Sequence, residues 1–183
     1  MTNIEQNQPV YISREEKNGI TQELLKAIFD YKDGNLYLKI TISKRQKRGD
    51  IVGYVNNHGY KMINIFSENY NISRLIFLYH KGFLREVIDH IDKDKGNDKI
   101  ENLRGCTFRE NMRNRTCAKN SSSRYLGVSY NSKTNNYTAK IRVDEGKSIR
   151  KNFKDEDKAA LFYNEMALLH FKEFASLNII KPK

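Results

Sequence analysis

Residues 87–91 (VIDHI) constrain the fold more than any other part of this 183-residue chain. The run is short and apolar, as expected of a buried strand, yet it contains a carboxylate and an imidazole, Asp89 and His90. A polar, turn-rich loop, an extended segment (IENLRGCT) and a helical segment (FRENMRNR) follow it. The sequence therefore predicts a strand, a loop, a second strand and a helix in succession.

Asp89 and His90 are residue types that phosphodiester hydrolysis requires. A base must activate water, and histidine titrates near neutral pH, so His90 suits that task. A hard cation must neutralise the leaving oxygen, and such cations take carboxylate ligands like Asp89. Adjacent side chains of a strand point to opposite faces, so the two residues need a twist or bulge to serve one site.

Residues 73–115 resemble the HNH nucleases of the homing-endonuclease type. In that family a V-D-H-I-D strand leads through a polar loop to an E-N-L-R segment and then to an E-N-x-x-N helix. Here Asn102 lies 13 positions and Asn111 22 positions after Asp89, which fits the ββα-metal layout of the family. Asparagine replaces the last histidine, so the chain is an H-N-N variant.

The resemblance implies a role for each of the four residues. His90 is the general base, and Asn102 holds its ring through a hydrogen bond. Asp89 and Asn111 are ligands of one divalent metal per active site, Mg²⁺ or Mn²⁺.

Five arginines surround this motif, and two interpretations stay open for them. They either contact phosphate or form a solvated basic face. Contact with DNA is favoured for the pair that follows Asn111. The arginines are Arg74, Arg104, Arg109, Arg113 and Arg115.

The excess of positive charge favours a polyanionic binding partner but does not require one. Lysine and arginine number 33 against 22 acids, and the isoelectric point is about 9.6. A generic basic surface would have the same excess. Cys106 and Cys117 form no C-x-x-C pair, which argues against a structural zinc site and fits a reducing compartment. The sequence shows no apolar signal core or membrane span, so a cytoplasmic protein is expected.

Turn-forming residues separate the elements predicted in the region that precedes residues 87–91. Residues 1–20 are polar and are expected to be poorly ordered or loosely docked. A helix should begin after Thr21, a hairpin should turn at residues 33–34, and a second should turn at residues 57–59. A further helix should end at Gly82.

A second unit is predicted after a serine-rich linker at residues 119–123. Residues 124–180 contain three strand candidates and a helix that Asp155 caps. Apolar residues recur at helical spacing and should pack on the sheet. They are Ala160, Tyr163, Ala167, Phe171 and Phe174. With residues 1–20 as a polar segment and 21–118 as the nuclease domain, these ranges complete the expected organisation.

The second unit resembles an AP2 domain through Y-x-G-V, Y-T-A-K-I-R, a strand ending at Phe153 and an A-A-x-x-Y-N helix. The resemblance implies a sheet lying in the DNA major groove with a helix behind it. The positions that would face DNA are Ser129, Asn131, Lys140, Arg142, Lys147 and Ile149. Ser129 stands where the family usually has arginine, and tryptophan is absent, so the target sequence cannot be inferred. A scaffold sheet with incidental charges is the alternative.

Alternation sorts the residues of the middle strand independently of the resemblance. One set should face the helix: Tyr137, Ala139, Ile141 and Val143. The other set should face away from it: Thr138, Lys140 and Arg142.

Together these features predict an α+β protein. N-terminal β-hairpins and a ββα-metal HNH core precede a three-stranded antiparallel sheet packed on one helix. The expected function is a divalent-metal-dependent endonuclease of the homing type acting on double-stranded DNA, carried by a phage or mobile element in a bacterial host. A monomer should nick, and a DNA-induced dimer should cut both strands. The alternative is a catalytically inactive DNA-binding regulator derived from such a nuclease.

Overall fold

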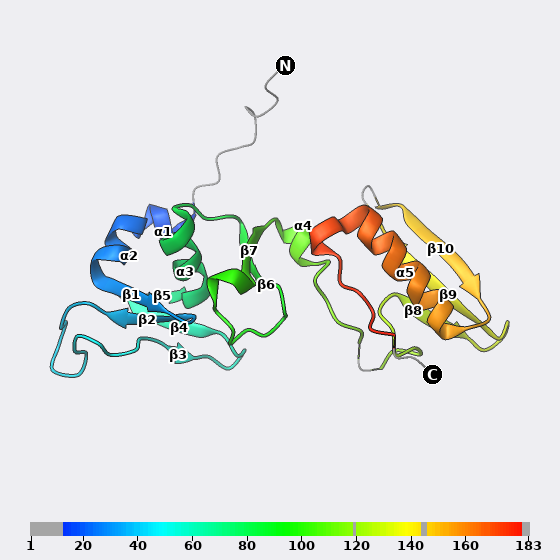
Figure 1. Ribbon diagram of the computed structural model, residues 1–183, viewed down its shortest axis with the longest axis horizontal. Coiled ribbons are helices and arrows are strands. Elements are labelled where there is room, and N and C mark those ends of the chain that lie inside the picture. The colour runs from blue at the N-terminus through cyan, green and yellow to red at the C-terminus, as the bar shows by residue number, and fades with distance from the viewer. Residues whose placement is uncertain (1–12, 119, 144–145, 181–183) are drawn as a thin grey trace, which may run out of the picture. The chain divides into compact units, whose positions relative to one another are not determined.

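The computed structural model describes residues 13–118, 120–143 and 146–180, which form two compact units (Figure 1). The units are Met1–Phe108 and Arg109–Lys183, and each combines helices with small antiparallel sheets. The expected α+β class is confirmed.

The division between the units falls before the serine-rich segment at which the sequence places a linker. Three contacts attach the preceding residues to the second unit. Arg113 lies over the Phe171 ring at 4.5 Å, and Cys117 packs against the core. The Ser176 hydroxyl donates to the Arg115 carbonyl at 2.9 Å.

The elements of the first unit are short and follow one another closely. The helices are α1 (Arg14–Lys17), α2 (Gln22–Ile28), α3 (Ile72–Lys81) and the 3₁₀ turn η1 (Ile100–Asn102). The strands are β1 (Phe29–Lys32), β2 (Asn35–Leu38), β3 (Tyr54–Val55), β4 (Lys61–Ile65), β5 (Glu68–Asn71), β6 (Val87–His90) and β7 (Leu103–Cys106). Helix α4 (Phe108–Asn111) spans the division between the units.

The residues from Ser13 onward are folded, so the expectation of a loose segment is wrong for residues 13–20. Ser13 and Glu16 form a reciprocal capping box at the start of α1. Ile20 is fully buried in the core. Nothing in the sequence indicated that this segment is folded, because a helix cap and an ion pair hold it in place rather than a stripe of apolar side chains. Residues 1–12 lie outside the described residues.

Both predicted hairpins are confirmed, and the second gains a strand. Asp33 and Gly34 have φ values of 48° and 77°, as a two-residue turn between β1 and β2 requires. The turn at residues 57–59 connects β3 to β4. A second tight turn at residues 66–67, also with positive φ, adds β5, which was not expected.

Helix α3 is the centre of the first core. Asn71 caps it, and Gly82, with φ 77°, ends it as the sequence predicts. Leu75 and Ile76 are fully buried and pack with residues of α2, the hairpins and β7.

The second unit is a sheet with one helix across one face (Figure 1). Strands β8 (Val128–Asn131), β9 (Asn136–Arg142) and β10 (Ser148–Phe153) are antiparallel in the order β10-β9-β8. Helix α5 (Glu156–Phe171) begins at the predicted cap, Asp155, and precedes the short turn η3 (Lys172–Phe174).

The predicted alternation along β9 is confirmed. Ala139 and Ile141 are buried against α5, whereas Lys140 and Arg142 are exposed. Phe174 lies beyond α5 in η3 and is only partly buried, so the predicted helical stripe ends at Phe171. Gly127 has φ 74°, and a Cβ there would overlap the Tyr163 ring, which explains the glycine of the Y-x-G-V motif.

None of the helices in the described ranges has the length and apolar character that crossing a bilayer requires.

A buried ion pair attaches α1 to the first core. The Arg74 guanidinium donates to both carboxylate oxygens of Glu15, with Nε–Oε1 2.5 Å and Nη2–Oε2 2.9 Å. Burial acts to raise the pKa of Glu15, but the hydrogen bond and charge of Arg74 outweigh it and hold the pKa below its ordinary value. Arg74, expected from the sequence near DNA, therefore has a structural role here.

Arg74→Ala should lower the free energy of unfolding by about 3 kcal/mol at neutral pH, because it leaves a buried carboxylate unpaired. Since the folded pKa of Glu15 is depressed, this stabilisation is present above the unfolded pKa and fades as pH falls through the folded one. Urea unfolding of wild type and variant across acidic pH measures it. Arg14→Ala, which breaks the exposed pair with Glu68, should change stability by less than about 1 kcal/mol. Equal effects of the two variants would contradict the assignment.

Candidate active site

The antiparallel pair of β6 and β7 positions Asp89. Asp89 lies opposite Arg104 in the register, and cross-strand neighbours on one face come within contact distance. Arg104 donates from Nε at 3.0 Å and from Nη2 at 2.8 Å, both to Asp89 Oδ2. Both side chains are largely buried, so this charged pair is held in one geometry.

The neighbouring residue, His90, is paired with a carboxylate of the following loop. Its Nε2 lies 2.9 Å from Oδ1 of Asp98, and the two side chains are only 6% and 1% exposed. Within the described residues, Asp98 Oδ2 has no hydrogen-bond donor, and the Lys61 ammonium lies 3.8 Å from it.

This contact bears on the tautomer of the neutral ring. An ionised carboxylate can only accept a hydrogen bond, and the Lys61 ammonium lies 3.8 Å from Oδ2 of Asp98. An ionised Asp98 would accept from Nε2 of the neutral ring, which leaves the lone pair on Nδ1.

Asn102 orders the loop that carries Asp98. Its Oδ1 accepts from the Asp92 N–H at 3.0 Å, and its Nδ2 donates to Asp92 Oδ1 at 2.9 Å and to the Asn97 carbonyl at 2.8 Å. From the sequence we expected Asn102 to hold the His90 ring through a hydrogen bond. Both amide hydrogens are used within the loop, and the side chain at Nε2 of His90 is that of Asp98.

A second set of bonds strengthens the same loop. Asn97 Nδ2 donates to Asp92 Oδ2 at 2.7 Å, and the Asp94 N–H donates to Asp92 Oδ1 at 2.8 Å. Burial acts to raise the pKa of Asp92, but these bonds and the one from Asn102 hold it below its ordinary value. The loop is therefore stable at neutral pH and loses this support only in acid.

The hairpins preceding the motif also contact the loop. The Ile100 N–H donates to the Tyr31 hydroxyl of β1 at 3.0 Å. Gly34, at the tip of the first hairpin, approaches the backbone of residues 98–99 so closely that a Cβ would lie 2.8 Å from Lys99 N. Tyr60 of the second hairpin lies near the His90 ring, with centroids 6.3 Å apart.

The remaining residues predicted for the motif belong to the second unit. Asn111 is the last residue of α4, and Arg113 and Arg115 follow it. Its role as a second metal ligand stays a prediction from the sequence.

The predicted DNA-facing positions of the sheet divide into two groups. Ser129, Asn131, Lys140 and Arg142 are exposed, and Lys147 is exposed just before β10. Ile149 is a correction, because it pairs with Ile141 and packs in the cluster beneath α5. Cross-strand partners share a face, so Ile149 cannot face away from the helix. Arg150, which pairs with Lys140, takes the exposed position that the sequence analysis missed.

Asp89 is a carboxylate that could serve as one oxygen ligand of a hard cation. No cluster of three or more histidine, cysteine, aspartate or glutamate side chains is placed to hold a metal among the described residues. Magnesium needs no such cluster, since one or two carboxylates with phosphate and water oxygens are its usual ligands. A buried carboxylate at the start of a motif for phosphate chemistry fits that requirement.

Two important residues of the first unit were not found from the sequence. Asp98 lies in a loop rich in aspartate, asparagine and lysine, where no spacing distinguishes it. Lys61 is one of many lysines and lies 37 positions before Asp98. Only the folded hairpins bring these two residues to His90.

Comparison with known proteins supports the assignment of this segment. Residues 70–113 match a family model described as HNH endonuclease. The chain is also similar to an uncharacterized HNH endonuclease, L560, of Acanthamoeba polyphaga mimivirus, with 40% identity over 93 residues. These cover 51% of this chain and 47% of the viral protein, so the chain matches about half of that relative. No solved structure matches. The segment that matches the HNH endonuclease model, residues 70–113, includes β6, β7 and α4.

Gly34→Ala should displace the segment that carries Asp98 and disturb the His90 ring. Gly19→Ala is a matched control, because Gly19 also has positive φ, 74°, but has nothing within 4 Å of its added Cβ. Both variants should lose about 1 kcal/mol of stability to backbone strain. Only Gly34→Ala should lose about 1–3 kcal/mol more and shift the His90 imidazole resonances in NMR spectra. Identical His90 resonances in the two variants would refute the contact.

Proposed function

We propose that this chain is a metal-dependent endonuclease that hydrolyses phosphodiester bonds of double-stranded DNA, with His90 as the general base. The observation that carries the proposal is the buried contact of His90, which follows Asp89 at the end of β6, with Asp98 of the next loop. Both residues lie within the segment that matches HNH endonucleases. A histidine held by a buried carboxylate is oriented in advance for proton transfer.

Asp98 prepares His90 for proton abstraction in two ways. By accepting the Nε2 hydrogen it keeps the lone pair on Nδ1, which is the atom that takes the proton from water. When the ring becomes positive, the carboxylate at 2.9 Å stabilises the new charge. Burial strengthens this attraction because little solvent separates the two groups.

Asp89 and Arg104 supply the electrostatic part of the site. Asp89 would hold the metal, Mg²⁺ or Mn²⁺, with Asn111 as the second ligand expected from the sequence. Such a metal, when bound, supplies Lewis-acid stabilisation of phosphate and leaving-group charge. Arg104 orients Asp89 through two N–H groups that donate to one carboxylate oxygen. Its guanidinium would also add positive charge near the scissile phosphate.

The second unit is proposed to recognise the target through its exposed sheet face. Lys140, Arg142 and Arg150 project from two adjacent strands on the face opposite α5. A twisted sheet with such a face can enter the major groove, as in the AP2 domains that this unit resembles. With one site per chain, a monomer nicks and two DNA-bound copies cut both strands, as expected of a homing endonuclease of a mobile element.

His90→Ala should lower the rate of DNA cutting at least about 100-fold and leave DNA affinity unchanged, because it removes the base and no phosphate contact. Plasmid nicking with Mg²⁺ or Mn²⁺ measures the rate, and gel shifts in EDTA measure affinity. His58→Ala, which removes an exposed histidine of the same unit, is the control and should cut normally. If wild-type protein binds DNA but cuts with neither metal, the chain is a DNA-binding regulator instead.

Asp98→Ala should lower kcat between about 10- and 100-fold without changing KM for DNA, because the ring remains but loses its orientation. Asp98→Asn, which keeps an acceptor oxygen of the same shape, should fall between wild type and Asp98→Ala. Single-turnover cleavage measures both variants, and their folding is checked by circular dichroism. A loss seen only in KM would show that Asp98 does not position the base.

A further inference from the structure

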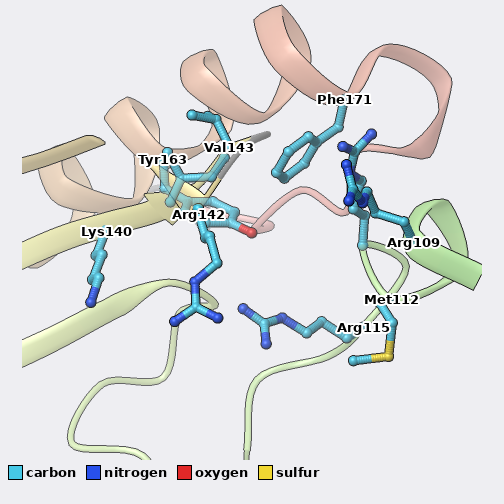
Figure 2. Close-up of a pocket in the computed structure, with 11 residues that line it drawn as sticks. Arg109, Met112, Arg115, Lys140, Arg142, Val143, Tyr163 and Phe171 are labelled. Atoms are coloured by element: carbon cyan, nitrogen blue, oxygen red, sulfur yellow. The ribbon is translucent and has the colours of Figure 1, made fainter. Parts of the chain in front are cut away.

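A strongly basic pocket lies within the second unit, between the segment that follows α4 and the end of β9 (Figure 2). Its volume is ≈ 680 Å³. Five described lining residues are cationic and none is acidic. They are Arg109, Arg113, Arg115, Lys140 and Arg142.

The cations come from two parts of the chain that the sequence assigns to different tasks. Arg113 and Arg115 follow Asn111 at the end of the HNH-like segment, whereas Lys140 and Arg142 belong to the sheet of the second unit. Figure 2 shows the guanidinium groups of Arg115 and Arg142 pointing toward one another across the pocket. Like charges that converge repel each other, so this arrangement favours binding of an anion between them.

The walls of the pocket are anchored rather than loosely placed. Arg113 lies over the Phe171 ring of α5 at 4.5 Å. The backbone of Arg115 is held by the Ser176 hydroxyl at 2.9 Å. Burial raises the pKa of Tyr163, and the charge of Arg115 acts against that shift, as expected of a guanidinium close to the phenol.

No carboxylate within the described residues neutralises the central cations. Arg115, Lys140 and Arg142 form no ion pair there, although Arg124 in the same unit pairs with Glu156 and Asp157. Among the described residues, Glu156 and Asp157 are thus paired with Arg124, and no ion pair is formed by Arg115, Lys140 or Arg142.

We propose that this pocket binds the phosphodiester backbone of DNA and gives the second unit a DNA contact that does not depend on base sequence. This proposal rests on the proposed function in taking DNA as the ligand, and it adds a site that the sheet face alone does not supply. The volume exceeds that of a single phosphate group and accommodates the adjoining sugar.

The chemistry of the lining favours phosphate over bases. Guanidinium groups bind phosphate oxygens in pairs, and Arg115 and Arg142 supply two such groups from opposite walls. The described lining contains no amide or carboxylate side chain, which are the groups that read adenine and cytosine. Arginine also reads guanine, and such a contact would be confined to duplexes with guanine at that position, whereas a phosphate contact would be made to every duplex. Arg142 thus positions the backbone, and sequence reading is left to other residues of the exposed face.

The test measures binding of the full chain to a panel of unrelated duplexes by fluorescence anisotropy, in EDTA and over a range of salt. Arg115→Gln and Arg142→Gln should each weaken binding about tenfold on every duplex at physiological salt. Each should also reduce the slope of log K against log salt by about one, because one phosphate contact is lost. No cutting occurs in EDTA, so the result stands apart from whether the protein is a nuclease.

Lys158→Gln is the matched control, because it removes one exposed positive charge from the first turn of α5 outside the pocket, and it should bind like wild type. Arg142→Lys, which keeps the charge, should keep the wild-type salt slope and covers the case in which Arg142→Gln misfolds. Unchanged affinity and slope in the two glutamine variants would overturn the proposal. A loss confined to duplexes of one sequence would overturn it as well, since it would mean base reading.

Discussion

The contact between His90 Nε2 and Asp98 Oδ1 joins the end of a strand to the middle of a polar loop, and much of the first unit serves to hold it. A histidine ring alone rotates and exchanges its hydrogen between two nitrogens. A buried carboxylate at 2.9 Å removes both freedoms at once. Asn102 fixes the loop from its far end, and Lys61 balances the charge of Asp98 from the second hairpin.

This dependence gives the N-terminal hairpins a purpose beyond covering the core. The first hairpin brings Gly34 against the backbone beside Asp98, where any side chain would collide. Its β1 strand also supplies the Tyr31 hydroxyl that accepts from the Ile100 N–H. Because the loop is polar, it could not hold its own shape by burying apolar surface, so neighbouring elements determine it through hydrogen bonds and close approach.

The sequence predicts what periodicity and turn chemistry encode. The hairpin at residues 33–34, the end of α3 at Gly82 and the burial of Ala139 and Ile141 follow from local rules and are confirmed. Contacts between residues distant in sequence were not predictable in this way. Glu15 meets Arg74 across 59 positions, which is why the folded N-terminal segment was missed.

Ile149 shows a different limit, since a resemblance assigned it to a surface that its strand register excludes. The residues of the candidate site also differ in whether the sequence indicated them. The spacing of Asp89, Asn102 and Asn111 was visible in the sequence, whereas the partner of the base was not. Asp98 is one of several aspartates in its loop, and no sequence spacing singles it out. Only the fold distinguishes it from Asp92 and Asp94.

The central claim is that Asp98 keeps the Nε2 hydrogen on His90 and so leaves Nδ1 to accept a proton. Long-range ¹H–¹⁵N correlation spectra of the imidazole, recorded at a pH where the ring is neutral, report the tautomer directly and need no activity. The account predicts a protonated Nε2 and an unprotonated Nδ1 in the wild type, with mixed tautomers in Asp98→Ala. A wild-type ring that carries its hydrogen on Nδ1 would contradict it.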